Sequence, residues 1–261
     1  ELDKGLNIIN KGINRFPDYI PFYKNLAAIY KNKGQFNKAI ECHLLVLKKN
    51  KLDFLSYYEL STIYDFKEHK DDLNRLLNTN INKLDLSSKI YAAFALANIF
   101  HKKKEYEKAS YFLKIANDES LKKSKSSYDL RIKNAESIRS IDIKKSKCEN
   151  IINSEQLIFI VGMPRSGSTL LENILSLNNQ VVDMGEIDFF EESLKEIKDI
   201  KDIYSAYKYK VKKRFKAASL FTDKNLFNYV YCPIIYRYFP NAKIIHCMRN
   251  PMDNILSMYR T

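Results

Sequence analysis

One stretch, residues 157–171 with the sequence LIFIVGMPRSGSTLL, constrains the fold of this chain more than any other. It begins with an uninterrupted apolar run, Leu157–Val161, which is typical of a strand buried in a parallel sheet. A glycine-bounded loop, Gly162–Gly167, follows, and apolar residues then recur at helical spacing. Such a loop and the helix after it present unpaired backbone N–H groups and the positive end of a helix dipole. The stretch therefore predicts an anion-binding site in an α/β domain.

The spacing of Gly162 and Gly167 is that of the phosphate loop in nucleotide triphosphatases, but the chemistry differs. Those loops place lysine after the second glycine and then a Ser or Thr that binds Mg²⁺. Here Ser168 takes the lysine position, and the cation lies upstream, at Arg165. A guanidinium stays charged and can bind two phosphate or sulfate oxygens at once. The loop therefore fits a phosphate-like group but argues against ATP hydrolysis and against a P-loop nucleotide kinase.

Residues 164–169, PRSGST, resemble the 5′-phosphosulfate loop of the sulfotransferase family, which often reads PKSGTT or PRSGTT. The arginine form is most similar to protein-tyrosine sulfotransferases and to bacterial sulfotransferases with tetratricopeptide (TPR) repeats. The single departure, Ser168 for Thr, retains a hydroxyl. The resemblance implies a metal-free site for 3′-phosphoadenylyl sulfate (PAPS). On this resemblance, the 5′-phosphosulfate is bound by the Arg165 guanidinium and by the loop N–H groups of Ser166, Gly167, Ser168 and Thr169.

Arg249 follows the apolar run 242–248, at the C-terminal end of an expected strand, where α/β sheets place their ligand sites. Ser257 comes eight residues later, about two turns into the next expected helix. A helix that packs back against the strand would bring the hydroxyl and the guanidinium to one anionic group. The pattern Arg-Asn-Pro-x-Asp-x3-Ser also resembles the family's 3′-phosphate motif, which implies that Arg249 and Ser257 bind the 3′-phosphate of PAPS.

Two further charged residues follow expected strands. Glu186 comes after Val181–Val182 in the segment Met-Gly-Glu, and Lys224 comes after residues 219–222 in the segment Asp-Lys-Asn. A carboxylate near the cleft can take the proton of an attacking hydroxyl, and a cation can stabilise charge on a leaving oxygen. Both segments resemble those of tyrosylprotein sulfotransferases and their TPR-bearing relatives, which implies that Glu186 is the catalytic base and that Lys224 stabilises the transferring group.

The first 120 residues contain an internal repeat. The pattern of Tyr23–Tyr30 recurs 34 residues later at Tyr57–Tyr64 and again at Leu96–Phe100, and Phe36–Ala39 recurs as Tyr106–Ala109. Period and pattern resemble the TPR, which implies a solenoid of paired helices. Its small residues would let paired helices approach closely: Ala27, Ala39, Ala97 and Ala109. A concave surface for a peptide or partner and a purely structural or dimerising arm remain equal alternatives.

The second repeat is degenerate, with Glu68 where glycine is usual and Leu73 where alanine is usual. Residues 1–15 are interpreted as the second helix of a repeat whose first helix is absent. We therefore expect further repeats before Glu1. Since sulfotransferases continue beyond the 3′-phosphate motif, we also expect more of that domain after Thr261, so the chain is interpreted as a fragment.

The secondary structure expected after residue 155 alternates strands and helices. Besides the first strand, Val181–Val182, 219–222 and 242–248 are expected to be strands. A single helix is expected over Glu191–Arg214. Another, over residues 227–238, is expected to be kinked at Pro233. A final helix is expected to begin at Asn254.

The formal net charge of +13 would suit nucleic-acid binding, but lysine is spread through the chain beside abundant asparagine and isoleucine, without an arginine-rich stripe. We therefore expect no nucleic-acid function and attribute the charge to composition. No stretch reaches the length of a membrane span. The cysteines lack paired spacing, which predicts a reducing, cytoplasmic compartment and no structural zinc: Cys42, Cys148, Cys232 and Cys247.

Together these patterns predict an α plus α/β chain: a TPR array over 1–120, a capping helix and polar linker over 121–154, and the N-terminal part of a sulfotransferase domain with a parallel sheet over 155–261. The predicted reaction moves a sulfuryl group from PAPS to an acceptor hydroxyl. Glu186, Arg165 and the repeats favour a polypeptide acceptor, with tyrosine expected. The alternatives are a carbohydrate or small-molecule acceptor, or a TPR adaptor with a vestigial phosphate loop.

Overall fold

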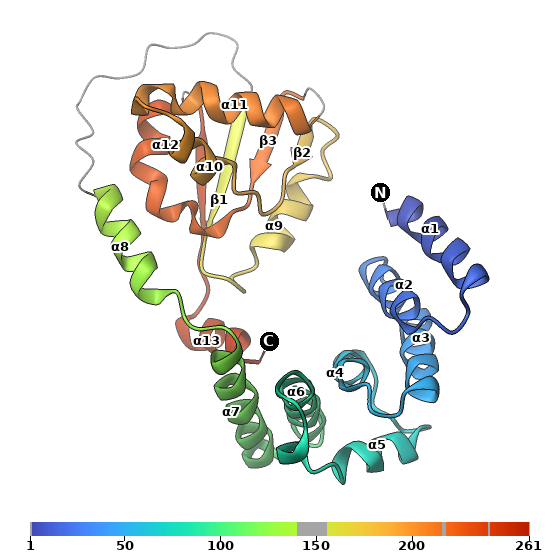
Figure 1. Cartoon of the computed structure of the whole chain (residues 1–261). Coiled ribbons are helices and arrows are strands. Elements are labelled where there is room, and N and C mark those ends of the chain that lie inside the picture. The colour runs from blue at the N-terminus through green and yellow to red at the C-terminus, as the bar shows by residue number, and fades with distance from the viewer. Residues whose placement is uncertain (1, 140–155, 216–217, 240, 261) are drawn as a thin grey trace. The chain divides into compact units, whose positions relative to one another are not determined.

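The computed structural model describes residues 2–139, 156–215, 218–239 and 241–260 (Figure 1). They divide into two compact units, each described by itself. The first comprises residues 1–126 with 259–261, and the second comprises residues 127–258.

The first unit is built from helices that pair along the chain. The most extensive contacts are those of α6 with α7, of α4 with α6 and of α2 with α3. The helices and a short 3₁₀ turn have these bounds: α1 Leu2–Arg15, α2 Ile20–Asn32, α3 Phe36–Lys49, α4 Phe54–Ile63, α5 Lys70–Leu77, η1 Ile81–Lys83, α6 Leu86–Lys102 and α7 Tyr106–Lys123. Gly34 and Lys104 both adopt positive φ, +71° and +63°, in the turns between α2 and α3 and between α6 and α7. Paired helices occur in many helical arrays, so the assignment to the TPR class stays a prediction.

Small residues lie at the contacts between the paired helices, as the repeat predicted. The alanines at these contacts are at most 4% exposed: Ala27, Ala39, Ala97 and Ala109. Between α6 and α7, the rings of Phe100 and Phe112 stack with centroids 5.5 Å apart. The degenerate second copy differs from the others, because α5 has only 8 residues where α3 has 14 and α7 has 18.

The second unit contains a four-stranded parallel sheet, as expected, with strand order β2-β3-β1-β4. The strands are β1 Gln156–Gly162, β2 Val181–Asp183, β3 Leu220–Asp223 and β4 Lys243–Cys247. Since β1 lies between β3 and β4, the chain leaves β1 toward one side of the sheet and later returns on the other. Ligands bind at such a switch point in open α/β sheets.

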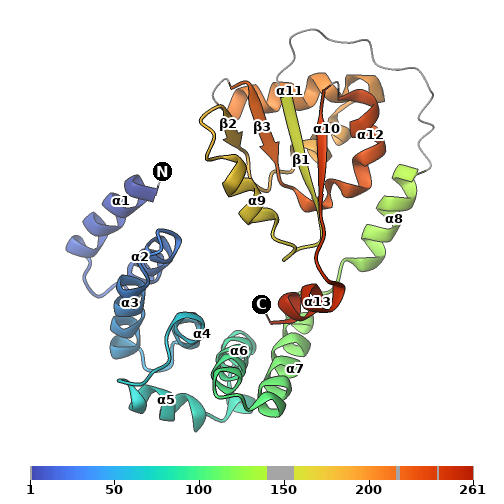
Figure 2. The same ribbon diagram turned by 180° about the vertical axis from the view of Figure 1, so that it is seen from behind.

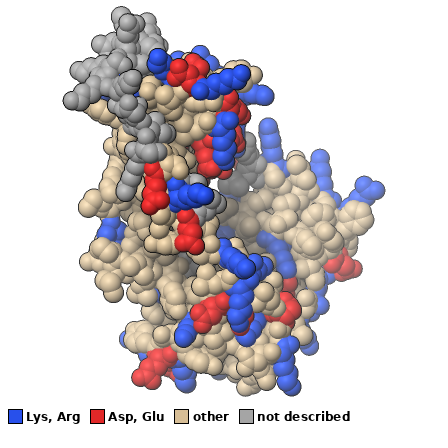
Figure 3. All heavy atoms as spheres, turned by 60° about the vertical axis from the view of Figure 1, so that its left-hand side comes forward, with Lys and Arg blue, Asp and Glu red and all other residues tan. Residues whose placement is uncertain are grey.

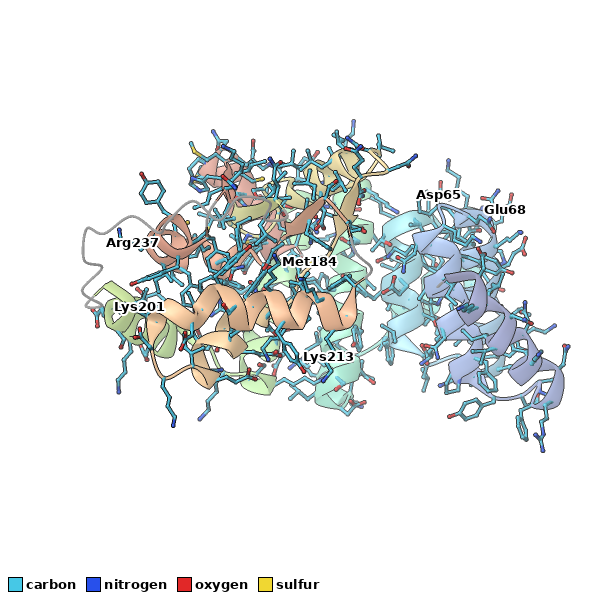
Figure 4. The ribbon with its side chains drawn as sticks, turned by 90° about the horizontal axis from the view of Figure 1, so that it is seen from above. Asp65, Glu68, Met184, Lys201, Lys213 and Arg237 are labelled. Carbon is cyan, nitrogen blue, oxygen red and sulfur yellow. The ribbon has the colours of Figure 1, made fainter. Side chains whose placement is uncertain are left out.

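Helices cover both faces of this sheet. The helical elements of this unit have these bounds: α8 Tyr128–Arg139, α9 Ser168–Leu175, α10 Phe189–Glu196, η2 Ile200–Asp202, α11 Ile203–Arg214, η3 Leu226–Tyr231, α12 Cys232–Tyr238 and α13 Pro251–Tyr259. The helices α10 and α11 lie over one face and α9 over the other (Figures 1 and 2). In Figure 4, α11 runs along the sheet between the labelled Lys201 and Lys213. Aromatic rings fill the space beneath α11, and Tyr207, Phe159 and Phe190 are completely buried there.

Three of the expected helices differ from the structure. The single helix expected over Glu191–Arg214 is wrong: α10 ends at Glu196, and the Asp199 carboxylate accepts the Lys201 N–H to start a new turn. The kinked helix is wrong as well, because residues 226–231 form a 3₁₀ turn and Pro233 lies in the first turn of α12, where proline is tolerated. The last helix begins at Pro251 rather than Asn254 because the Asn250 side chain accepts the Met252 N–H.

The amphipathic stretch after residue 126 forms α8, which groups with the second unit. The rest of the expected linker, residues 140–154 with Cys148, lies outside the described residues. Within the described ranges, no helix is long and apolar enough to cross a membrane. On the face shown in Figure 3, basic and acidic side chains are interspersed.

Candidate functional site

Four charged side chains follow the carboxyl ends of the four strands. Arg165 lies three residues after β1, and Glu186 three residues after β2. Lys224 directly follows β3, and Arg249 lies two residues after β4. Because the strands are all parallel, these ends meet at one edge of the sheet. The sequence-predicted residues are thereby brought to the same edge.

The loop after β1 begins with a glycine that has no room for a side chain. A Cβ placed on Gly162 would lie 2.5 Å from the carbonyl oxygen of Cys247 on β4, and its φ is +145°. The loop backbone thus approaches the neighbouring strand directly. At the other end of the loop, Gly167 has φ +94° and forms the N-cap of α9. The first N–H groups of α9 have no carbonyl partner within the helix, so they can bind an anion.

Arg165 sits in the middle of this loop in a left-handed conformation, with φ +68°. A non-glycine residue keeps this conformation only when its surroundings hold it there. The Arg249 guanidinium donates to the Arg165 carbonyl oxygen (3.2 Å), and the Asn254 amide donates to the Pro164 carbonyl oxygen (2.5 Å). Arg165 in turn donates from Nε to the Ser257 hydroxyl oxygen (3.2 Å). The phosphate-type loop is therefore held by β4 and α13.

A cavity of about 390 Å³ opens at this edge of the sheet. Its walls are Pro164, Arg165, Gly167, Ser168, Thr169, Glu186, Asn225, Leu226, Phe227, Arg249 and Ser257. Of the sequence-predicted site residues, only Ser166 and Lys224 are missing from this lining. The size suits a ligand of nucleotide scale, since small-molecule sites commonly occupy roughly 300–1,000 Å³.

The residues at the loop fit an anionic group. The Ser166 hydroxyl oxygen is buried and has no hydrogen-bond partner among the described residues. A buried hydroxyl without a partner is uncommon in folded proteins, but this oxygen does not line the cavity. Two guanidinium groups, those of Arg165 and Arg249, line the same cavity. Across the described part of the chain, no group of three or more metal-ligating side chains is present.

Glu186 and Lys224 form an ion pair at the cavity. Lys224 Nζ lies 2.7 Å from Glu186 Oε1, and the lysine side chain is only 6% exposed whereas the glutamate side chain is 68% exposed. Glu186 lines the cavity and Lys224 lies behind it. A buried cation and an exposed carboxylate therefore meet next to the loop. This pair can accept a proton at its outer member and supply positive charge from its inner member.

Residues 157–216 and 192–261 match the model of the sulfotransferase family. The α/β unit is similar to sulfotransferases. This match supports sulfuryl transfer in general terms. The whole chain is also 26% identical to an uncharacterized protein of Aquifex aeolicus (strain VF5); the chain spans 38% of that protein's length. No solved structure matches the chain significantly.

Behind the sulfotransferase-like site lies a buried carboxyl group that the sequence analysis did not single out, Asp223. Its oxygens accept hydrogen bonds from the Tyr207 hydroxyl (2.7 Å), the Asn225 N–H (3.0 Å) and the Asn228 amide (3.1 Å). Burial raises its pKa to about 7, and the nearby Glu172 charge adds to the rise, whereas the three hydrogen bonds oppose it. The hydrogen bonds fix the loop that directly follows Lys224.

Two other residues at the site were missed. Asn254 is buried and donates to the Pro164 carbonyl oxygen of the loop. In the sequence it is only the first residue of an expected helix, which gives no indication of that contact. Glu172 is 4% exposed on α9. The signal in the sequence was a single acidic residue within the apolar run of that helix, which we interpreted only by its hydrophobic neighbours.

Proposed function

We propose that this protein is a sulfotransferase that uses PAPS as the sulfuryl donor and transfers the group to an acceptor hydroxyl. The observation that carries the proposal is the shared cavity: the Arg165 loop, Glu186, Arg249 and Ser257 line one space at the switch point of the sheet. The match to the sulfotransferase family supports the same chemistry. When bound, PAPS would supply an activated sulfuryl group on its 5′-phosphate.

On this proposal, the two ends of the donor are bound by different parts of the cavity. Arg165 and the N–H groups of Ser166 to Thr169 bind the 5′-phosphosulfate. Arg249 and Ser257 bind the 3′-phosphate. The fit is supported by Arg165 and Arg249, which both line the cavity. Cations next to a helix N-terminus stabilise doubly charged groups of this kind.

In the transfer step, residues of this chain take up the acceptor proton and stabilise the charge on the leaving oxygen. The acceptor oxygen forms a bond to sulfur, and its proton passes to the Glu186 carboxylate. The bond between sulfur and the bridging oxygen breaks, and that oxygen keeps the electron pair on adenosine 3′,5′-bisphosphate. Lys224 stabilises the charge that grows on the bridging oxygen. Lys224 Nζ lies 2.7 Å from Glu186 Oε1, and this proximity supports the role of Glu186 as the base and of Lys224 as the cation in one step.

For the acceptor, we propose a polypeptide hydroxyl, with tyrosine first. The helical first unit, read as a TPR array, would then bind the polypeptide or a partner on its surface. The cavity supports an acceptor that enters past Glu186, which is the exposed member of the ion pair. A carbohydrate or small-molecule hydroxyl remains the alternative, and a panel of acceptors with radiolabelled PAPS separates the two.

The donor is tested by isothermal titration calorimetry with adenosine 3′,5′-bisphosphate, ATP–Mg²⁺ and 5′-AMP. We expect the bisphosphate to bind most tightly and Arg249→Ala to weaken it by about 100-fold, as expected when a charge-assisted contact to an anion is lost. The same variant should weaken 5′-AMP binding by much less than bisphosphate binding, because Arg249 supports the 5′-phosphate loop only through its contact with the Arg165 carbonyl oxygen. Arg237→Ala, a substitution on α12 outside the cavity lining, serves as the matched control. A preference for ATP–Mg²⁺, or equal loss for both ligands, would refute the proposal.

A further inference from the structure

Glu172 is a buried carboxylate that the proposed transfer step does not yet use. It lies on α9, one turn after Ser168 of the phosphate-type loop, and is 4% exposed. A buried carboxylate is retained in a fold only when other groups satisfy it. Its contacts therefore indicate what it does.

One oxygen of Glu172 receives two hydrogen bonds from two different strand ends. The Gly185 N–H donates to Oε1 (3.2 Å), and the Thr222 hydroxyl donates to the same oxygen (2.9 Å). Gly185 directly precedes Glu186, and Thr222 lies two residues before Lys224. A single atom thus connects the backbone beside the proposed base with the strand beside the proposed cation.

The backbone at these strand ends is paired as well. Met184 N–H donates to the Thr222 carbonyl, and Lys224 N–H donates to the Gly185 carbonyl, both at 3.0 Å. Gly185 leaves this pairing with φ +68°, which turns Glu186 toward the cavity. The Glu172 oxygen accepts the N–H of that same glycine and so holds the turn.

The second oxygen of Glu172 faces Lys224. Glu172 Oε2 lies 3.9 Å from Lys224 Nζ, and both side chains are at most 6% exposed. Lys224 therefore lies between two carboxylates, Glu186 on the exposed side and Glu172 on the buried side. When Glu186 takes the acceptor proton and becomes neutral, Glu172 remains as a negative partner for the ammonium group.

We propose that Glu172 is a positioning residue for sulfuryl transfer, which fixes the separation of Glu186 and Lys224 through the contacts of Oε1 with Gly185 and Thr222 and through the charge of Oε2 beside Lys224. The inference rests on the proposed function. The helix α9 would then have two roles. Its N-terminus binds the donor, and its residue Glu172 aligns Glu186 with Lys224.

The contact with Gly185 gives a readout that does not depend on activity. The chain has six glycines, so ¹⁵N-glycine labelling yields six amide resonances, and Gly185→Ala assigns the relevant one. We expect the Gly185 resonance to move as Glu172 titrates and to stop moving with it in Glu172→Gln. Burial raises the pKa of Glu172, while its hydrogen bonds and Lys224 lower it. Asp183, Glu186, Asp223 and Lys224 also lie near Gly185, and the Glu172 charge contributes to the raised pKa of Asp223. The comparison is therefore made in an Asp223→Asn background, in which the Asp223 titration is absent from both proteins.

Kinetic and binding measurements use the same variant, Glu172→Gln. Glutamine retains an oxygen for both donors but has no charge. The amide that replaces Oε2 no longer attracts the Lys224 ammonium group, so we expect Lys224 to move by about 1 Å. We therefore expect kcat to fall by about 100-fold, while the affinity for adenosine 3′,5′-bisphosphate changes by less than about two-fold. Glu196→Gln, an exposed glutamate paired with Lys210, should leave both values unchanged.

Thr222→Val provides a second variant in case Glu172→Gln does not fold. It removes one donor to Oε1 and leaves the charge of Glu172 in place. We expect a smaller loss of kcat with unchanged bisphosphate affinity and a Gly185 resonance that still titrates.

Three outcomes would overturn the inference. They are a Gly185 resonance that behaves alike with and without Glu172→Gln in the Asp223→Asn background, a wild-type kcat in Thr222→Val, and a loss of bisphosphate affinity that matches the loss of kcat. Wild-type protein that does not bind the bisphosphate at all would refute the proposed function itself, so the two failures are distinguishable.

Discussion

Replacing Asp223 by asparagine should stabilise the α/β unit at pH 8 and have much less effect at pH 5. The carboxyl group of Asp223 is inaccessible to solvent, and burial raises its pKa from 3.8 to about 7. Asparagine has the same shape and retains the oxygen that accepts from the Asn225 N–H and the Asn228 amide. The Tyr207 hydroxyl, which donates to the other oxygen, can instead accept from the new amide.

The direction of this pH dependence follows from which state, folded or unfolded, binds the Asp223 proton more tightly. Above about pH 4 the unfolded chain has lost the proton, whereas the folded protein keeps it until about pH 7, so folding takes up a proton in this window. The free energy of unfolding therefore falls as the pH rises from about 4 to about 7 and then levels off. The full difference between 3.8 and about 7 corresponds to about 4 kcal/mol, of which about 2–3 kcal/mol is lost between pH 5 and pH 8.

The measurement is urea denaturation at pH 5, 6.5 and 8, followed by circular dichroism, for wild type and Asp223→Asn. The free energy of unfolding of the variant minus that of wild type should rise by about 2–3 kcal/mol between pH 5 and pH 8. Asp202→Asn, a substitution of an exposed carboxylate at the start of α11, should follow the wild-type curve. If wild type and Asp223→Asn differ by the same amount at all three pH values, the buried carboxyl does not carry the proton that this reasoning assigns to it.

Further predictions concern the support of the loop and a buried thiol. Gly162→Ala should destabilise the α/β unit by about 3 kcal/mol or more in urea denaturation, because the new Cβ meets the Cys247 carbonyl 2.5 Å away at a φ of +145°; an effect below about 1 kcal/mol would contradict the close approach. Asn254→Ala removes the donor to the Pro164 carbonyl and should weaken bisphosphate binding about ten-fold in calorimetry, whereas Asn173→Ala on the exposed side of α9 should not. Burial raises the pKa of Cys42 to about 11, so iodoacetamide at pH 8 should label it much more slowly than an unfolded control, as followed by mass spectrometry.

The sheet and its loop could be predicted from the sequence because local patterns determine them. A short apolar run that ends at a glycine-bounded turn favours a buried strand, and the structure gives β1 over Gln156–Gly162. The other three strands were short apolar runs of the same kind and were also confirmed. The strand order was not predictable, since it depends on which runs pack beside β1 and not on any one of them.

Helix boundaries were less predictable, because side-chain caps compete with the hydrophobic period. The side chains of Asp199 and Asn250 accept backbone N–H groups and so start new helical turns at positions that the apolar spacing alone does not reveal. The site residues were found by motif where a loop sequence carries the chemistry, as for Arg165. Glu172 and Asp223 were missed because their environment is created by elements distant in the sequence.

On the proposed function, the contact between Gly162 and the Cys247 carbonyl also has a consequence for ligand selectivity. Adjacent strands are about 4.8 Å apart, so the backbones that lead to the phosphate-type loop and to Arg249 are separated by one inter-strand spacing. In the structure, Gly162 and Cys247 are partners in the register of β1 and β4. Widening this spacing would break sheet hydrogen bonds, and narrowing it is prevented by the carbonyl itself. The protein should therefore discriminate between isomeric bisphosphates of equal charge, such as the 2′,5′ and 3′,5′ forms, by the distance between their anionic groups.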